Sequence, residues 1–375
     1  MAPDRRRHPA FAAFAFLVLV VSVWLGFRTG SGPAKTPRPP SIATSPTVAA
    51  DVPPPTSVAP VEDRSPSGVL ARIFSRLRSG QLAPGELDAL RKAILAAPHA
   101  EAIAAIVDFL ASGQDALTGE LFTVGTGGEL SGAPTFRVLL LDLLGRICQE
   151  TRTSEALNVS KALLQTKTSA DEWAIALRNV GWATPQDRDF LVEKARELIR
   201  HQPWRQQPSA GFYEAMDVIV FARGVALIPD LSALAEAEDP ALQASAAVAL
   251  DRLAEFAPLE AMTFLNQNQQ ELADLPFLRA DYFSKADLSQ PAQRQAVEMY
   301  LSRPDVKPQE KAKMLAVLAS PGSFASETLL TELPPEEFPP ERIAGLRQTV
   351  ADWLKTQRFP ALQGPLLQLQ ARIAD

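Results

Sequence analysis

Apolar side chains recur at helical spacing along most of the chain after about residue 66. In the clearest stretch, Leu227, Leu231 and Leu234 fall on one face at i, i+4 and i+7. After a polar break the spacing returns, on Leu242, Ala246, Ala249, Leu250 and Leu253. Asp239 suits the N-cap of this second helix, and Pro240 suits its first turn, where a missing N–H costs nothing. The stretch therefore predicts two amphipathic helices joined by one turn.

The same pattern recurs on both sides of this pair. A shift of 106 positions places Pro134 on Pro240 and Leu144 on Leu250 and keeps the apolar register, and a shift of 36 keeps it again. A period in the thirties built from helix pairs is typical of an α-solenoid, in which each pair buries its apolar face against the next. We therefore expect residues 67–375 to form six to eight stacked helix pairs, with no sheet beyond one small hairpin.

A glycine-rich stretch, Gly113 to Pro134, interrupts the helical pattern. Gly125, Gly127 and Gly128 precede a helix, as in loops that cradle phosphate, but they lack the preceding apolar strand and the Lys-Ser/Thr ending of such loops. The stretch is instead expected to be an inter-helix loop, with Phe122 packed beneath a short hairpin. Because it exceeds the usual length of a connection, it is also a candidate functional surface loop.

The segment Asp239 to Leu253 resembles the second helix of a HEAT repeat. In that motif Asp-Pro is followed by an aliphatic-Arg pair, an Ala-rich core and Ala-Leu-Gly. Gln243 stands where the family usually has Arg, and Asp251 where it has Gly, whereas an earlier segment keeps both, as Arg137 and Gly145. The resemblance to the HEAT and armadillo-like family implies a right-handed α-solenoid, and such arrays serve mainly as binding scaffolds.

The run Ala10 to Phe27 has eighteen residues without a charge. As a helix at 1.5 Å per residue it would extend about 27 Å, which predicts one transmembrane helix. Arg5, Arg6 and Arg7 precede it, which favours a short cytoplasmic tail at residues 1–9 and an extracytoplasmic C-terminal part. We expect a single-pass protein of a bacterial inner membrane with its folded part in the periplasm.

A cleaved signal peptide is the alternative, and it would leave a secreted, soluble solenoid. The N-terminal position favours cleavage, whereas the run exceeds the usual apolar core of about 7 to 15 residues and lacks a clear A-x-A site. Residues 28–66 follow with ten prolines among thirty-nine residues and no apolar periodicity. They predict a disordered, Pro-rich linker between the membrane and the folded part.

Composition and charge narrow the classes of partner. Ala and Leu dominate after residue 66 and runs of β-branched residues are scarce, which favours an all-α fold. The whole chain carries a net charge of −6, and residues 67–375 hold 30 basic against 39 acidic residues. Because phosphate contacts need a basic surface, no nucleic-acid partner is expected. The single cysteine, Cys148, lies on an apolar stripe and is expected to be a buried thiol.

A partner is expected to dock on the concave wall of the solenoid, with the Gly113 to Pro134 loop at its rim. The second helix of each pair lines that wall, including the helix that contains Arg342. Trp, Tyr and Arg are favoured anchors at interfaces, and a polar loop after a long helix carries two more of them. The candidate partner-binding residues are Arg137, Trp173, Trp204, Arg205, Tyr213 and Gln243. The alternative is that these side chains only pack between repeats.

No arrangement of residues predicts a catalytic, cofactor or metal site. The three His are far apart, and the acidic clusters lie at helix starts or turns, where carboxylates suit the helix dipole. These clusters are Glu236, Glu238 and Asp239, and Glu336 and Glu337. The sequence thus predicts a membrane-anchored, extracytoplasmic scaffold that binds a protein partner of unknown identity and is not an enzyme. An envelope hydrolase with acidic residues in the concave groove is the alternative.

Overall fold

The computed structural model describes residues 63–318, 327–332 and 338–374. These residues are helical apart from loops and one two-stranded hairpin. The predicted cytoplasmic tail (1–9), the membrane helix (10–27) and nearly all of the linker (28–66) lie outside them. Within the described parts of the chain, no helix combines the length and the apolar character that crossing a bilayer requires.

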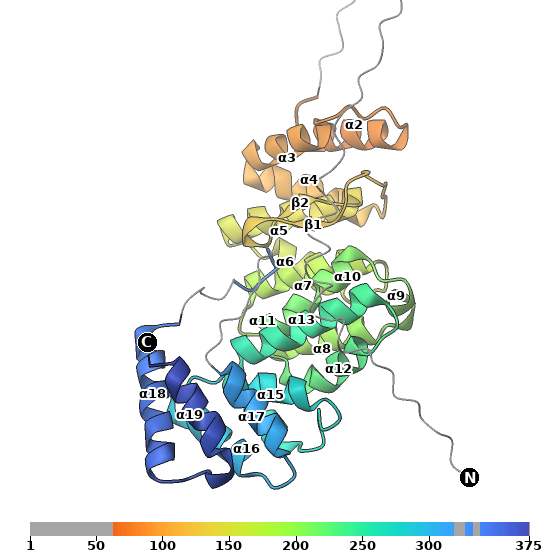
Figure 1. Cartoon of the computed structure of the whole chain (residues 1–375). Helices are drawn as coiled ribbons and strands as arrows, with labels where there is room; N and C mark the ends of the chain where they lie inside the picture. The colour runs from red at the N-terminus through yellow and green to blue at the C-terminus, as the bar shows by residue number, and fades with distance from the viewer. Residues whose placement is uncertain (1–62, 319–326, 333–337, 375) are drawn as a thin grey trace, which may run out of the picture. The chain divides into compact units, whose positions relative to one another are not determined.

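The central feature is a row of helices in which each packs against the next (Figure 1). These first-row helices are α5 (Phe136–Thr151), α7 (Ala170–Ala183), α10 (Ala210–Glu214), α11 (Met216–Phe221), α13 (Pro240–Phe256), α15 (Pro276–Ser284) and α17 (Pro308–Val317). Apart from α11, which directly follows α10, they begin 30 to 40 residues apart. This spacing agrees with the predicted period in the thirties.

A second row of helices packs against the first. Its members are α6 (Glu155–Leu163), α8 (Arg188–Arg200), α12 (Ile228–Ala235), α14 (Pro258–Gln267) and α16 (Pro291–Ser302). α6 contacts α5 and α7, α8 contacts α7 and α11, α12 contacts α13, and α14 contacts α13, α15 and α16. The alternation of the two rows makes the fold all-α and helical-repeat-like, consistent with the expected α-solenoid.

Further elements lie before, between and after the rows. They are α2 (Pro66–Arg78), α3 (Glu86–Ala96), α4 (His99–Ala111), α9 (Gln202–Gln206), η3 (Val225–Leu227), α18 (Pro340–Lys355), η4 (Pro360–Leu362) and α19 (Gln363–Arg372). α4 packs on α5, and α19 packs on α17 and α18. The apolar pattern does not reveal α15 and α19. In α15 the buried face includes Arg279 and Ser284, and these polar residues interrupt the stripe.

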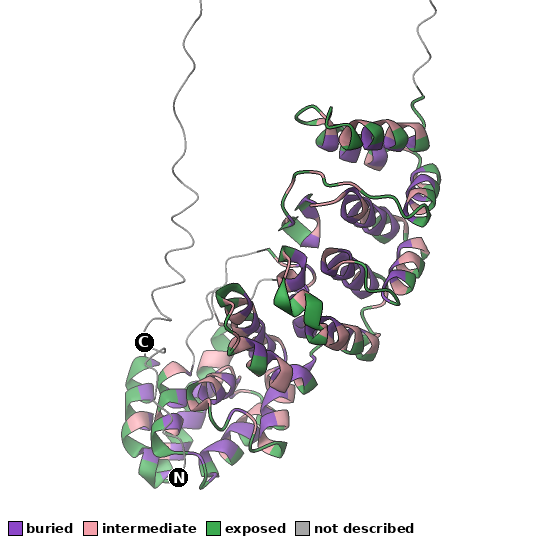
Figure 2. Cartoon of the chain, turned by 90° about the vertical axis from the view of Figure 1, so that its right-hand side faces the viewer, coloured by how far each residue is buried: buried purple, intermediate pink, exposed green. Residues whose placement is uncertain are grey.

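Helix α13 confirms the predicted register. Its expected apolar positions, Leu242, Ala246, Ala249, Leu250 and Leu253, are all buried. The Asp239 carboxylate caps the helix and accepts a hydrogen bond from the backbone N–H of Leu242 at 2.7 Å. Figure 2 shows the same division along the rows, with a buried face and an exposed face on most helices. Burial of one face per helix is the main source of stability in such an array.

Three local expectations can be compared with the structure. The glycine-rich stretch forms the expected small hairpin, with β1 (Thr123–Val124), η2 (Thr126–Gly128) and β2 (Leu130–Gly132), and Phe122 is buried. The segment 211–224, expected to be one helix, is divided at Ala215 into α10 and α11. The expected loop around Trp204 instead contains the short helix α9, because Pro203 suits a first helical turn.

Ion pairs join successive repeats. Each links side chains 30 to 37 residues apart, close to one repeat in length. The pairs are Arg137 with Glu172, Arg178 with Asp142, Arg200 with Asp230, Arg223 with Glu260, Arg279 with Glu310, and Lys285 with Glu255. The exposed pairs add little stability because water screens them, and the buried pairs are offset by the cost of removing both charges from water. We therefore expect these pairs mainly to fix how neighbouring repeats align.

Candidate partner-binding surface

A short segment, Glu327 to Glu332, lies across the first row, and we call it the strap. It contains no helix or strand of its own, it bends at Leu329 and Leu330, and within it the Thr328 hydroxyl donates to the Thr331 carbonyl. It meets the hairpin at Gly128, α7 at Gly181, α11 at Asp217 and α13 at Arg252. At least 79 residues of sequence separate its residues from the first-row residues to which they hydrogen-bond. The first row therefore holds a short, bent segment from a distant part of the chain.

Asp217 holds the main chain of the strap. One carboxylate oxygen, Oδ2, accepts the backbone N–H groups of Leu330 at 2.7 Å and of Thr331 at 3.0 Å. The other, Oδ1, accepts the Thr331 hydroxyl. Asp217 is 8% exposed, so these bonds are largely shielded from water. A buried carboxylate that accepts charge-assisted bonds from two successive N–H groups holds a turn-like backbone firmly.

Arg252, on α13, also holds the strap. Its Nη1 lies 3.4 Å from the Asp217 carboxylate, and its Nη2 donates to the Thr331 hydroxyl and, at 3.4 Å, to the Glu332 carbonyl. The Thr331 hydroxyl thus donates to one charged group and accepts from the other. Arg252 is 3% exposed, and its Nε has no acceptor among the described residues. Asp217 and Arg252 together therefore contact both the main chain of the strap and the hydroxyl of Thr331.

Leu329 and Leu330 of the strap each lie close to a glycine. Leu329 is fully buried, and its carbonyl lies so close to Gly128 that a β-carbon there would collide with it. A β-carbon at Gly181 would lie 2.8 Å from the Leu330 side chain. Gly128 also has φ +81°, and its carbonyl accepts the buried Arg178 guanidinium at 2.7 Å. Both glycines permit the close approach of the strap.

A second acid, Glu214, lies beside the Asp217 carboxylate. Burial and, to a smaller extent, the negative charge of Asp217 raise the pKa of Glu214 to about 7, while Arg252 opposes the rise. Near neutral pH this carboxyl is therefore partly protonated. A partly protonated acid thus lies near the carboxylate that holds the strap.

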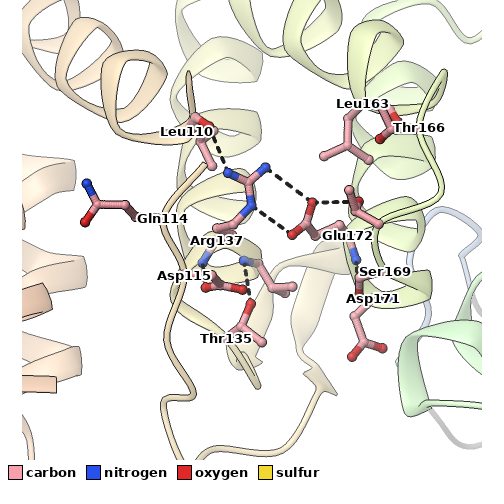
Figure 3. A network of polar contacts seen from close by, with 12 residues as sticks. Leu110, Gln114, Asp115, Thr135, Arg137, Leu163, Thr166, Ser169, Asp171 and Glu172 are labelled. Atoms are coloured by element: carbon pink, nitrogen blue, oxygen red, sulfur yellow. Dashed lines mark hydrogen bonds and ion pairs between the residues drawn. The ribbon is translucent and has the colours of Figure 1, made fainter. Parts of the chain in front are cut away.

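Arg137, expected to face a partner, forms hydrogen bonds with residues of its own chain (Figure 3). Its Nε donates to Glu172 at 2.9 Å and its Nη1 donates to the Leu110 carbonyl at 2.8 Å. Glu172 also accepts the Thr168 hydroxyl at 3.2 Å and is nearly buried. Arg137 therefore links α4, α5 and α7. This agrees with the alternative that these side chains pack between repeats.

Trp173 also has a packing role. Its side chain is completely buried, its indole N–H donates to the Thr166 carbonyl at 2.6 Å, and Trp204 packs on its edge at 5.3 Å between ring centroids. This burial agrees with the alternative that Trp173 packs between repeats. Trp204 is half-buried and Arg205 is exposed on α9. Those two residues lie beside each other on a surface helix.

The remaining candidates are partly accessible. Tyr213, on α10, is half-buried four residues before Asp217. Gln243, on α13, is also half-buried, but at nine positions before Arg252 it lies on roughly the opposite side of the helix from the strap. Arg342 donates to the Lys285 carbonyl at 2.8 Å from α18, a helix that packs mainly on α19. Val248 lies one turn before Arg252 and therefore on the same side of α13 as the strap. It is 42% exposed and so marks this side of the helix better than Gln243 does.

The other chemically interesting residues take structural positions. Cys148 is a free, buried thiol, as expected. Asp239 caps α13, while Glu236 and Glu238 are exposed in the turn before it. The acids at 336 and 337 lie outside the described residues. In the described parts of the chain, no three His, Cys, Asp or Glu side chains are grouped so that they could hold a metal ion.

Comparison with protein-family models, with curated proteins and with solved structures gives no significant match. The strap site therefore stands on its own geometry. Sequence reasoning missed its residues, although a signal exists in two of them. Asp217 is a charged position inside the otherwise apolar segment MDVIVF, and Arg252 lies beside Asp251 between the apolar residues of LDRLA. A buried charge needs a partner, but the sequence does not say that the partner is Thr331.

Proposed function

We propose that the protein is a membrane-anchored, extracytoplasmic helical-repeat scaffold that binds a protein partner on its first row. The two-row, all-helical fold and the helix-pair period support a right-handed α-solenoid of HEAT-like repeats. The apolar run at residues 10–27 supports a membrane anchor, and the prolines of residues 28–66 support a spacer. On this proposal the scaffold faces the periplasm of a bacterium.

One observation carries the binding role: the first row holds a bent segment of chain by hydrogen bonds to its main chain. Asp217 and Arg252 bind backbone groups of the strap, and these contacts suit any segment that presents the same groups in the same bent conformation. Successive N–H groups in a turn conformation are a general means of binding an anionic group. A partner that inserts such a segment would use the same surface.

The proposal is tested by photocrosslinking in intact cells. A photoreactive residue at Val248 lies on the strap face of α13, and a matched residue at the exposed Ala162 of α6 lies in the second row. We expect a discrete protein adduct from position 248 and none from position 162. Adducts from position 162 alone would show that the partner binds elsewhere.

One observation favours a hydrolase as a second candidate. Glu214, with a pKa of about 7, lies beside Asp217, and a buried acid of raised pKa suits general acid–base chemistry. Against this role, both Asp217 oxygens already accept bonds from the strap and Arg252. Peptidoglycan or peptide cleavage by the purified protein, abolished in Glu214→Gln, would establish the hydrolase; no cleavage by the native chain excludes it.

A further inference from the structure

The contacts of the strap restrict which residues can occupy each of its positions. The same restrictions would apply to a ligand that binds at this site. Asp217 Oδ2 accepts two successive N–H groups, a contact that a segment bent in the same way and without proline at those positions can make. The side-chain contacts are narrower. Leu329 is completely buried, and Leu330 lies against the bare Cα of Gly181. Position 331 must both donate and accept a hydrogen bond.

A hydroxyl is the group that fits this last position. The Thr331 hydroxyl donates to Asp217 Oδ1 and accepts from Arg252 Nη2, and Thr331 itself is only 9% exposed. Valine has the same shape but would leave the Asp217 and Arg252 groups without these bonds, and unsatisfied buried charges are costly. Serine or threonine is therefore required, whereas the exposed Glu327 and Glu332 are free to vary.

We propose that the strap occupies, in cis, the site that a partner's segment takes, and that this segment is a short bent chain of two adjacent aliphatic residues followed by Thr or Ser. The inference rests on the proposed scaffold function and adds to it the identity of the ligand class and a built-in competitor. The buried Arg252 Nε, which the strap leaves without an acceptor, offers a further contact to a ligand in trans.

A competitor on the same chain lowers the apparent affinity for a ligand in trans. Tethered segments act at effective concentrations on the order of millimolar. The apparent Kd equals the intrinsic Kd divided by the fraction of molecules with a free site. The native chain is therefore held in a weakly binding state, and a variant with a disabled strap binds more tightly.

Fluorescence anisotropy with a labelled peptide tests this inference. The probe is Glu-Thr-Leu-Leu-Thr-Glu, the strap sequence, and the control peptide carries Val in place of the second Thr. The full-length chain in detergent is compared with the variant Leu329→Gly, Leu330→Gly, Thr331→Gly, which leaves the first row unchanged. We expect the variant to bind the probe at least tenfold more tightly than the native chain. We expect the control peptide to bind the variant at least tenfold more weakly than the probe.

Two results overturn the inference. One is a variant of native helix content that does not bind the probe, and the other is equal binding of the probe and the control peptide. Thr331→Val is a milder variant that keeps the test decisive if the glycine variant unfolds, since it removes only the hydroxyl bonds and should still tighten probe binding severalfold. If the peptide fails while position 248 still crosslinks to a protein, the scaffold function stands and the ligand class is wrong.

Discussion

Buried charges define the chemistry of the first row at the scale of single residues. Asp217, Arg252 and Glu214 lie together there, and Arg137 and Glu172 form a comparable pair between the earlier helices α5 and α7. In both ion pairs each charge is balanced by a partner from another repeat, because an unpaired charge in such a place would cost several kcal/mol, whereas Glu214 has a raised pKa instead. These side chains therefore couple neighbouring helices through electrostatics as well as packing.

The raised pKa of Glu214 predicts a pH dependence of stability. Its folded pKa of about 7 exceeds the ordinary value of 4.5, so the folded state binds the proton more tightly than the unfolded state. The native chain should therefore lose stability, relative to Glu214→Gln, as pH rises from about 4.5 to about 7. The loss should be on the order of 2 to 3 kcal/mol. Urea unfolding of both proteins between pH 4.5 and 8 measures it; parallel curves would contradict the assignment.

The pair of Arg137 and Glu172 predicts a second effect. Arg137→Leu leaves Glu172 buried without its guanidinium partner, which should reduce the free energy of unfolding by about 3 to 5 kcal/mol. The double variant with Glu172→Leu removes both charges and should recover most of that loss. Chemical denaturation of the single and double variants decides. An equal loss in both would mean that Arg137 acts through packing alone.

At the scale of elements, the sequence predicts helices better than it predicts what lies between them. The register of α13, its Asp239 cap and the small hairpin follow from periodicity and local chemistry. The break at Ala215 and the helix α15 do not, because buried polar residues obscure the apolar stripe. The strap is beyond local reasoning altogether, since its partners lie at least 79 residues away in sequence.

The hairpin offers a matched pair of glycines that tests how the strap is seated. Gly127 and Gly128 both have positive φ, but only a β-carbon at Gly128 would meet the Leu329 carbonyl. Gly127→Ala should cost about 1 to 2 kcal/mol from backbone strain alone. Gly128→Ala should cost clearly more, because it also pushes the strap away. Equal losses in thermal or urea unfolding would show that the strap does not rest on Gly128.

At the scale of the whole molecule, the rows of helices stabilise one another through shared apolar faces. Leu250 is completely buried in α13, which contacts α10, α11, α12, α14 and α15, whereas Val248 on the same helix is 42% exposed. Leu250→Asp should lower stability by several kcal/mol and melt the central repeats, while Val248→Asp should change it by less than about 1 kcal/mol. Circular dichroism melts compare them, and similar melts would mean that the register of α13 is wrong.

The binding role depends on the main chain of the strap being held by Asp217. Amide hydrogen exchange at Leu330 and Thr331 measures this directly in the full-length chain. We predict that both amides exchange at least a hundredfold more slowly than in an unfolded peptide. In Asp217→Ala this protection should be lost, while amides in the buried centre of α7 keep theirs. Exchange of Leu330 and Thr331 at unfolded rates in the native chain would contradict the account, because the first row would then not hold the strap.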